Sequence, residues 1–347
     1  ARIALLPGSG WPQQTGVAEL EQMAPLTGSF VELGDEGCVV WARTGKKLNS
    51  IQSGYARPAL AAGKTRFVLY NRSGNELRVE SRTQNLYTKQ LENSIFLCAM
   101  SDNGTLAVVT EDQTSMAKLL VYSPSMEQQL SWSMTSNDGT PLRMAFSPDS
   151  RKLAAAVTVS GGQVMTNLYL INLASGDPVS LVNQGGVPQW LGWTSASTIL
   201  AVYDTRAVLY NAGGGERAVY DFAGTELKDV SVDAAGNVAL LLASGQVSQA
   251  VTLDKNLNVQ FSAAVSAANS IVRAGNLCWP ITPWSALMRP APSSGARTLT
   301  PARRHCWPTA RIFCCSAATR CRSWKHPLNN PLRQCLRIAT SPKERGN

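Results

Sequence analysis

The sequence predicts an all-β fold, a β-propeller of four-stranded blades, and two observations support this prediction. Between about residues 29 and 272 helical periodicity is almost absent, and short apolar or alternating runs are separated by clusters of Gly, Asn, Asp, Ser and Pro. A turn-and-strand unit recurs along the same region about every 40 residues, the length of one four-stranded blade. We expect about seven blades in the intact protein, the last one or two of them lost, followed by a disordered or irregular C-terminal tail.

The expected strands are rich in Val, Leu, Ala and Tyr, residues that suit half-buried or buried β-structure. Typical runs are 66–70 (RFVLY), 106–109 (LAVV), 119–122 (LLVY) and 168–171 (LYLI). Residues 17–23 alone show a short helical pattern, so we expect a helical turn there.

The repeated unit begins with a polar turn and continues into an apolar strand. SDNGTLAVV at 101–109 recurs as SPDSRKLAAAV at 147–157 and as VDAAGNVALLL at 232–242. Looser copies place turns near positions 62 and 195 as well. Asp and Asn accept local backbone hydrogen bonds and Gly adopts positive φ, so each turn should join two inner strands in a hairpin. A β-sandwich with chance internal similarity is the alternative fold.

The run MAFSPDSRKLA at 144–154 resembles the FSPDGxxLA turn of WD40-like propellers. The whole of residues 1–275 resembles an uncharacterised bacterial propeller family, domain of unknown function 5711, although no Trp-Asp dipeptide closes any blade. Members of that family usually carry one N-terminal membrane anchor. The resemblance implies that residues 1–24 follow a missing anchor, that residues 25–275 form the propeller, and that the propeller lies on the extracytoplasmic face of the cell membrane.

The charge of the chain is unevenly distributed. The formal net charge is +9, yet residues 275–347 contain ten Arg and two Lys against the single acid Glu344, which leaves the preceding residues slightly acidic. This tail also holds six of the eight cysteines and both histidines, His305 and His326. Cys38 and Cys98, the remaining two, stand far apart among apolar neighbours and are expected to be buried thiols.

Residues 276–347 allow three interpretations. A zinc site is disfavoured because Cys314 and Cys315 are adjacent and no C-x-x-C pair occurs. A basic arm that binds nucleic acid would explain the arginines, but not the six cysteines. The favoured interpretation is a frameshift near Asn276. In the shifted frame the third base of each codon is read together with the first two bases of the next codon. Read in this way, the codons of residues 277–296 are compatible with VLAYNAVERFDAAGTLVWS, which has the turn-and-strand pattern of the preceding blades.

The propeller region shows no catalytic motif. It contains no histidine and no Gly-x-Ser-x-Gly, and Gly213–Gly215 is followed by neither the Lys-Ser/Thr nor the helix of a phosphate loop. The acidic turns at 102–104 and 149 lack the ligand spacing of a calcium loop. Three tryptophans could form a recognition surface on one face or pack between blades: Trp132, Trp190 and Trp193.

The sequence therefore predicts a non-catalytic binding or scaffold propeller without a cofactor, a monomer whose partner is a protein or a cell-envelope component. A propeller enzyme, either a hydrolase or quinoprotein-like, is the first alternative. The second alternative assigns nucleic-acid binding to the basic tail.

Overall fold

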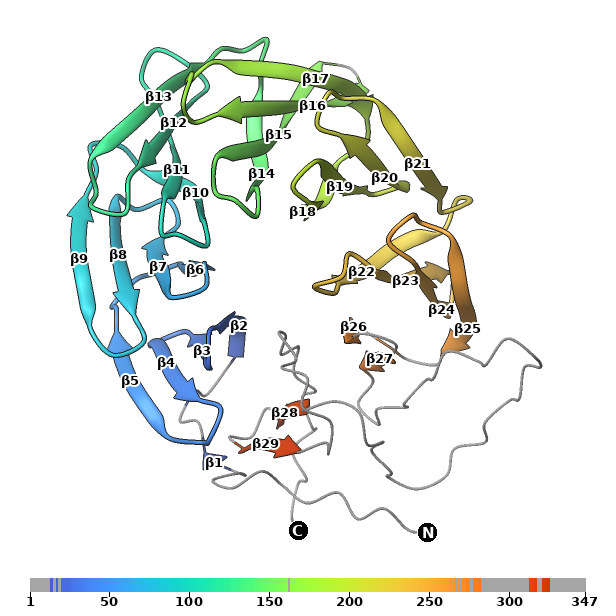
Figure 1. Ribbon diagram of the computed structural model, residues 1–347, viewed down its shortest axis with the longest axis horizontal. Helices are drawn as coiled ribbons and strands as arrows, with labels where there is room; N and C mark the ends of the chain where they lie inside the picture. The colour runs from blue at the N-terminus through green and yellow to red at the C-terminus, as the bar shows by residue number, and fades with distance from the viewer. Residues whose placement is uncertain are drawn as a thin grey trace.

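The fold is all-β throughout the part of the chain that the computed structural model describes, namely residues 13–14, 17, 20–161, 163–265, 268, 270–274, 277–281, 312–316 and 320–324. Strands there assemble into six four-stranded antiparallel sheets, and in each sheet the spatial order equals the chain order. Figure 1 shows the sheets arranged radially around a centre, as the blades of a propeller. This arrangement confirms the predicted propeller and excludes the two-layer sandwich.

Each blade consists of four consecutive strands, numbered from the centre outward. Blade 1 contains β2 (Leu20–Leu26), β3 (Ser29–Gly34), β4 (Gly37–Ala42) and β5 (Lys47–Gln52). Blade 2 contains β6 (Pro58–Ala62), β7 (Arg66–Asn71), β8 (Glu76–Ser81) and β9 (Asn85–Gln90). Blade 3 contains β10 (Ile95–Met100), β11 (Leu106–Thr110), β12 (Ala117–Tyr122) and β13 (Gln128–Met134).

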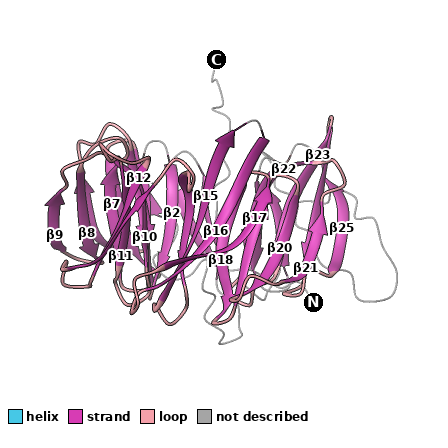
Figure 2. Ribbon diagram, turned by 90° about the horizontal axis from the view of Figure 1, so that it is seen from above, coloured by secondary structure: helices cyan, strands magenta, loops and turns pink. Residues whose placement is uncertain are grey.

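The second half of the ring repeats this plan. Blade 4 contains β14 (Thr140–Phe146), β15 (Lys152–Gly161), β16 (Gln163–Asn172) and β17 (Pro178–Gly185). Blade 5 contains β18 (Pro188–Ser195), β19 (Thr198–Tyr203), β20 (Arg206–Asn211) and β21 (Glu216–Asp221). Blade 6 contains β22 (Glu226–Val232), β23 (Val238–Ser244), β24 (Val247–Leu253) and β25 (Val259–Val265). Figure 2 shows the ring edge-on, with the strands running between its two faces.

A seventh sheet begins after blade 6. It pairs β26 (Ser270–Ala274) with β27 (Leu277–Ile281), and β26 packs against β22 and β23. The backbone N–H of Ile271 donates to Asp229 Oδ2 over 2.8 Å, and the N–H of Arg273 donates to Ser231 Oγ over 3.1 Å. Side chains of blade 6 therefore hold β26 in the position of an innermost strand, as expected for a ring of about seven blades.

The tail contributes a further small sheet. It has the order β1 (Gln13–Gln14), β29 (Arg320–Trp324), β28 (Ile312–Ser316), and it joins segments from the two ends of the sequence. Most of the predicted irregular tail lies outside the described residues, and so do the side chains on which the zinc and nucleic-acid interpretations depend.

The predicted polar turns join the two innermost strands of blades 2 to 6. In blade 3, Asn103 Oδ1 accepts hydrogen bonds from Ser101 Oγ (2.6 Å) and from the Thr105 N–H (2.9 Å), and Gly104 has a φ of +95°. In blade 6, Asp233 Oδ1 accepts the N–H groups of Ala235 (2.8 Å) and Asn237 (2.9 Å). The turn oxygens close hairpins, as the repeat predicted.

The small-residue strands after these turns form the core between blades. β11 (LAVVT) and β19 (TILAVY) are buried along their whole length, and β23 (VALLLAS) is buried except at its last residue. Alternate side chains of each strand enter the clusters on its two sides, so every interior blade contributes to two interfaces. The burial of these strands agrees with the buried β-structure that their composition predicts.

The expected helical turn at residues 17–23 is wrong. Leu20–Leu26 forms β2, which pairs along its length with β3, and Ala24 and Leu26 face the core at a spacing of two. The pairing of β2 with β3 and the burial of its alternate side chains stabilise a strand more than the weak local pattern favours a helix. Pro25 is tolerated because β2 is an edge strand. The first blade consequently begins at Leu20. None of the described residues belongs to a helix long and apolar enough to cross a membrane.

Candidate functional site

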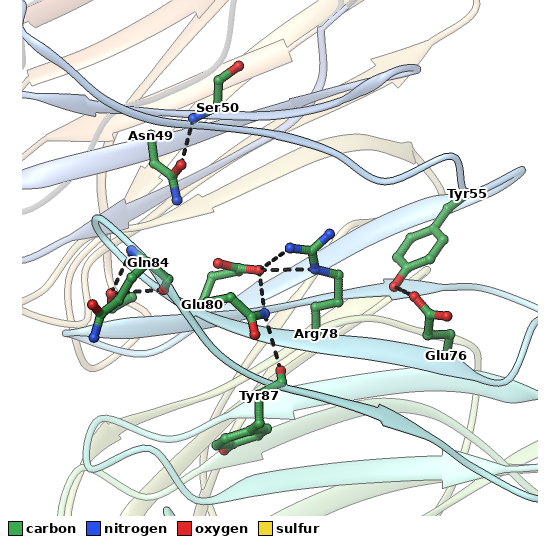
Figure 3. Close-up of polar contacts among 10 residues, drawn as sticks. Asn49, Ser50, Tyr55, Glu76, Arg78, Glu80, Gln84 and Tyr87 are labelled. Atoms are coloured by element: carbon green, nitrogen blue, oxygen red, sulfur yellow. Dashed lines mark hydrogen bonds and ion pairs between the residues drawn. The ribbon is translucent and has the colours of Figure 1, made fainter.

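A polar pocket of about 220 Å³ opens between blades 1 and 2, near the outer rim of the ring. We call it the blade 1–2 pocket. Its walls are β5 on one side and, on the other, β8 with the turn that leads into β9 (Figure 3). The lining residues are Asn49, Ser50, Ile51, Gln52, Arg78, Glu80, Thr83, Gln84 and Asn85.

The alternation of β8 creates this pocket. In the run ELRVES, Leu77 and Val79 point into the apolar cluster shared with blade 3, so the intervening Glu76, Arg78 and Glu80 point toward blade 1. Nearer the ring centre the same interface between blades is apolar. β8 is the only third strand among the six described blades with charges at three alternating positions.

Glu80 is the most deeply buried polar group of the pocket, with an exposed fraction of 1%. Its Oε1 accepts hydrogen bonds from Arg78 Nε (3.1 Å) and Asn85 Nδ2 (2.8 Å), and Arg78 Nη2 lies 3.0 Å from the same oxygen. The other oxygen, Oε2, is buried and has no hydrogen-bond partner in the structure. A buried acceptor without a hydrogen-bond donor lowers the stability of the folded state by about 1–3 kcal/mol.

Asn85 is placed to meet Glu80 by the strand register. The two residues are direct partners across the β8–β9 pair, next to a bulge between Val79 and Glu80. Asn85 Nδ2 also donates to the Tyr87 carbonyl oxygen over 3.4 Å. Bulges commonly redirect a side chain at the edge of a sheet, and this one lies beside the carboxylate.

Tyr55 and Cys38 border the same interface. Tyr55 Oη donates to Glu76 Oε1 over 2.7 Å, and burial, followed by this hydrogen bond, raises the pKa of Tyr55 above its ordinary range. Burial, followed by the negative charge of Glu80, raises the pKa of the Cys38 thiol to about 12. Cys38 therefore stays protonated near neutral pH, and both Cys38 and Cys98 are buried as predicted.

The chemistry of the pocket is that of recognition by hydrogen bonds. It combines one carboxylate, one guanidinium, several side-chain amides and hydroxyls, and little apolar surface. Across the described part of the chain, no three His, Cys, Asp or Glu side chains lie close enough to hold a metal ion.

The three predicted tryptophans do not form one surface. Trp132 lies on the outermost strand β13, where its ring packs edge-on against Tyr169 with centroids 4.9 Å apart. Trp190 and Trp193 both lie on the innermost strand β18, but they pack into different clusters. Trp190 packs toward blade 6, and Trp193 toward blade 4, where its Nε1 donates to the Ala145 carbonyl oxygen over 3.0 Å. Each tryptophan is partly buried between blades.

Sequence reasoning missed Glu76, Arg78 and Glu80. These residues belong to no catalytic motif. The available signal was the ELRVES alternation, since a buried third strand of a blade would otherwise be apolar on both faces.

Comparison with known families and structures places this fold in context. The family model described as a family of unknown function, DUF5711, matches residues 12–270. The chain belongs to the DUF5711 family. A search of curated proteins found no match.

The solved structures similar to this DUF5711 protein share its fold at low sequence identity. Apo AztD from Citrobacter koseri has a TM-score of 0.56 and 12% identity over 76% of this chain and 79% of its own. U3-55K has a TM-score of 0.52 and 11% identity over 92% and 100%. The WD40 repeats of RRP9 have a TM-score of 0.50 and 11% identity over 80% and 92%. These similarities establish the propeller fold of the DUF5711 protein.

Proposed function

We propose that this propeller is a non-catalytic binding module of the bacterial cell envelope, monomeric and displayed on the extracytoplasmic face of the membrane. The observation that supports this proposal is the blade 1–2 pocket, whose lining is polar and contains a buried carboxylate, Glu80, that Arg78 and Asn85 hold in place. The partner is an envelope component or an envelope protein, and the protein requires no cofactor.

Neighbouring side chains and a rigid strand hold the carboxylate of the pocket in position. Arg78 and Asn85 fix Glu80 from one side, and Glu80 lies on a strand within a packed blade. A group positioned by neighbours on rigid strands loses little freedom when it binds, so more of the interaction contributes to affinity. The arrangement supports selective binding of a polar group.

The rival function is a propeller enzyme. A hydrolase would need a base beside a nucleophile, and the pocket pairs its carboxylate with a guanidinium. We therefore assign the pocket to binding.

Sedimentation with bacterial envelope fragments tests the proposal. We expect the full chain to sediment with the fragments, and Glu80→Gln to bind about tenfold more weakly, because the amide loses the charge-assisted hydrogen bonds that position Arg78 and Asn85 in the lining. Lys228→Met is the control, since this exposed lysine on β22 lies in blade 6 and should leave binding unchanged. Equal sedimentation of Glu80→Gln and the parent chain, or saturable turnover in a panel of hydrolase substrates, would overturn the proposed function.

A further inference from the structure

Positive charge is concentrated in the turns at one end of blades 1 and 2. Because consecutive strands are antiparallel, the first and third turns of a blade lie at the same end of it. In these two blades the turns are 27–28, 43–46, 63–65 and 82–84, and they contain no acidic residue. The cations of the turns, with the first residue of β5, form what we call the basic end: Arg43, Lys46, Lys47, Lys64 and Arg82.

Hydrogen bonds hold the four turns together around Thr27 and Gly28. The N–H of Thr27 donates to the Lys64 carbonyl oxygen over 2.7 Å, so the inner turns of the two blades meet. Arg82 Nη1 donates to the Thr27 carbonyl oxygen over 3.2 Å. The N–H of Arg43 donates to the Gly28 carbonyl oxygen over 3.2 Å, and the two lysines of the basic end in blade 1 follow in the same turn. The five cations therefore share one surface.

The charge of the basic end is mostly uncompensated. Lys46, Lys47, Lys64 and Arg82 are exposed. Lys64 pairs with Asp102 of blade 3, and the other three make no ion pair with an acidic side chain in the described part of the chain. Like charges held together repel one another, so an anionic partner would relieve a repulsion that the fold otherwise retains.

The opposite face of the ring has the reverse balance. In blades 1 to 3 its turns hold the acids Asp35, Glu36, Glu92, Glu111, Asp112 and Asp138. Against these stand two bases, Arg57 and Arg72. A negatively charged surface would attract the basic end and repel the opposite face, so the bound ring would take a defined orientation.

The form of the basic end favours a flat partner over nucleic acid. Its turns contain two to four residues and lie along one face of the ring (Figure 2). A duplex groove is entered by a helix or a ribbon, and single strands stack on exposed aromatic rings. The four turns contain no aromatic residue, and Phe30 and Trp41 of the adjoining strands β3 and β4 are only 1% and 4% exposed.

A bilayer that contains anionic lipids fits this surface. It is broad and flat, and each Lys or Arg near its headgroups strengthens binding about fivefold. Among the described residues, the exposed large hydrophobic side chains all lie outside the basic end. The contact is therefore electrostatic, without insertion of apolar side chains among the acyl chains.

We propose that the basic end of blades 1 and 2 docks the ring on a membrane surface that contains anionic phospholipid, with Lys46, Lys47, Lys64 and Arg82 facing the headgroups. This inference goes beyond the proposed binding function and does not rest on it, because none of the five cations lines the blade 1–2 pocket.

Flotation of the full chain with lipid vesicles tests the inference. The vesicles contain phosphatidylcholine alone, or phosphatidylcholine and phosphatidylglycerol in equal parts. We expect binding to the mixed vesicles only. Binding should be lost when the salt concentration rises from about 0.1 to about 1 M, since the screening length falls from about 10 to about 3 Å. Lys46→Gln with Lys47→Gln should weaken binding about thirtyfold, the combined effect of two removed charges.

The matched control removes the same charge from the opposite face, because the basic residues of 275–347 also attract anionic vesicles. Arg57→Gln with Lys228→Gln changes two exposed cations near the starts of the innermost strands β6 and β22. These charges lie away from the docked surface, so binding should change less than about threefold. If the first double variant fails to fold, Lys64→Gln in blade 2 decides, with an expected loss of about fivefold.

Three outcomes would overturn the inference. Equal weakening by the two double variants would show that net charge or residues 275–347 account for binding. Equal flotation with both kinds of vesicle would exclude recognition of anionic lipid. Binding of a DNA duplex that depends on Lys46 and Lys47, without vesicle binding, would assign the basic end to nucleic acid. Glu80→Gln should float like the parent chain, so a failure of the pocket and a failure of the basic end are distinguishable.

Discussion

Arg273 Nε lies 3.7 Å from Asp233 Oδ2 in a buried ion pair, with only 3% and 6% of the two side chains exposed. The same guanidinium donates to the Val238 carbonyl oxygen over 3.2 Å and to Gln260 Oε1 over 2.9 Å. Asp233 belongs to the inner hairpin turn of blade 6, and Arg273 to β26. The pair therefore joins the last complete blade to the beginning of the next.

Arg273→Met should destabilise the protein by about 3–5 kcal/mol, because the change leaves Asp233 as a buried and uncompensated charge. Urea unfolding followed by fluorescence measures the effect. The exposed pair of Lys228 and Glu226 provides the control, and Lys228→Met should cost less than about 1 kcal/mol. Equal costs for the two variants would show that the buried pair does not hold β26 to blade 6.

Gly63→Ala should destabilise the contact between blades 2 and 3 by about 1–3 kcal/mol. A methyl group at Gly63 would collide with the backbone carbonyl of Ser101, which is part of the neighbouring blade's inner turn and cannot move away cheaply. Gly185→Ala is the matched control, since a methyl group there meets no atom within 4 Å. Its effect should stay within about 0.5 kcal/mol. Thermal unfolding of the two variants makes the comparison.

Alkaline pH should weaken the fold through Cys38. The thiol ionises at about 12 when folded and near 9.0 in its ordinary state, so unfolding releases a proton between these values and stability falls as the pH rises above 9. Cys38→Ala should remove up to about 1.4 kcal/mol per pH unit from that slope. Urea titrations at pH 8, 9.5 and 11 measure it. An unchanged slope would contradict the burial of this thiol in solution.

We expect the tryptophans that pack between blades to stabilise the fold. Trp193→Phe loses the hydrogen bond to Ala145 and should cost about 0.5–1.5 kcal/mol. Trp190→Ala should cost about 3–5 kcal/mol, because it removes a large side chain from the packing between blades 5 and 6. Neither change should alter sedimentation with envelope fragments. Loss of sedimentation at full stability would support the recognition surface that the sequence suggested for Trp132, Trp190 and Trp193.

The reading frame near Asn276 gives a prediction at the level of the gene. Resequencing codons 270 to 280 should reveal one base gained or lost, as the blade-like alternative reading of residues 277–296 indicates. A chain with the frame restored should be more soluble, because a complete ring covers the edges of its first and last blades. An unaltered gene sequence across these codons would contradict the frameshift.

The blades could be predicted from the sequence because their turns carry strong local chemistry. In these turns Gly104 has a positive φ, and side-chain oxygens of Asn103 and Asp149 accept backbone N–H groups. A strand does not accommodate such residues, so they mark each hairpin in the sequence as a repeat. β2 was predicted wrongly because its pairing with β3 is a tertiary effect. The blade 1–2 pocket could not be predicted, because Asn49 and Glu80 belong to different blades and meet only through the packing of those blades.

Each blade is built from four consecutive strands and touches only its neighbours, so damage to the gene stays local. An error in one segment removes the packing partner of at most two adjacent blades and leaves the others with their own hairpins and cores. Such a fold can gain or lose a blade during evolution without redesign of the rest. The end of the gene encodes the blade that lies between blade 6 and blade 1 in the ring, so a fault there deprives blade 1, one wall of the blade 1–2 pocket, of a neighbour on its other side.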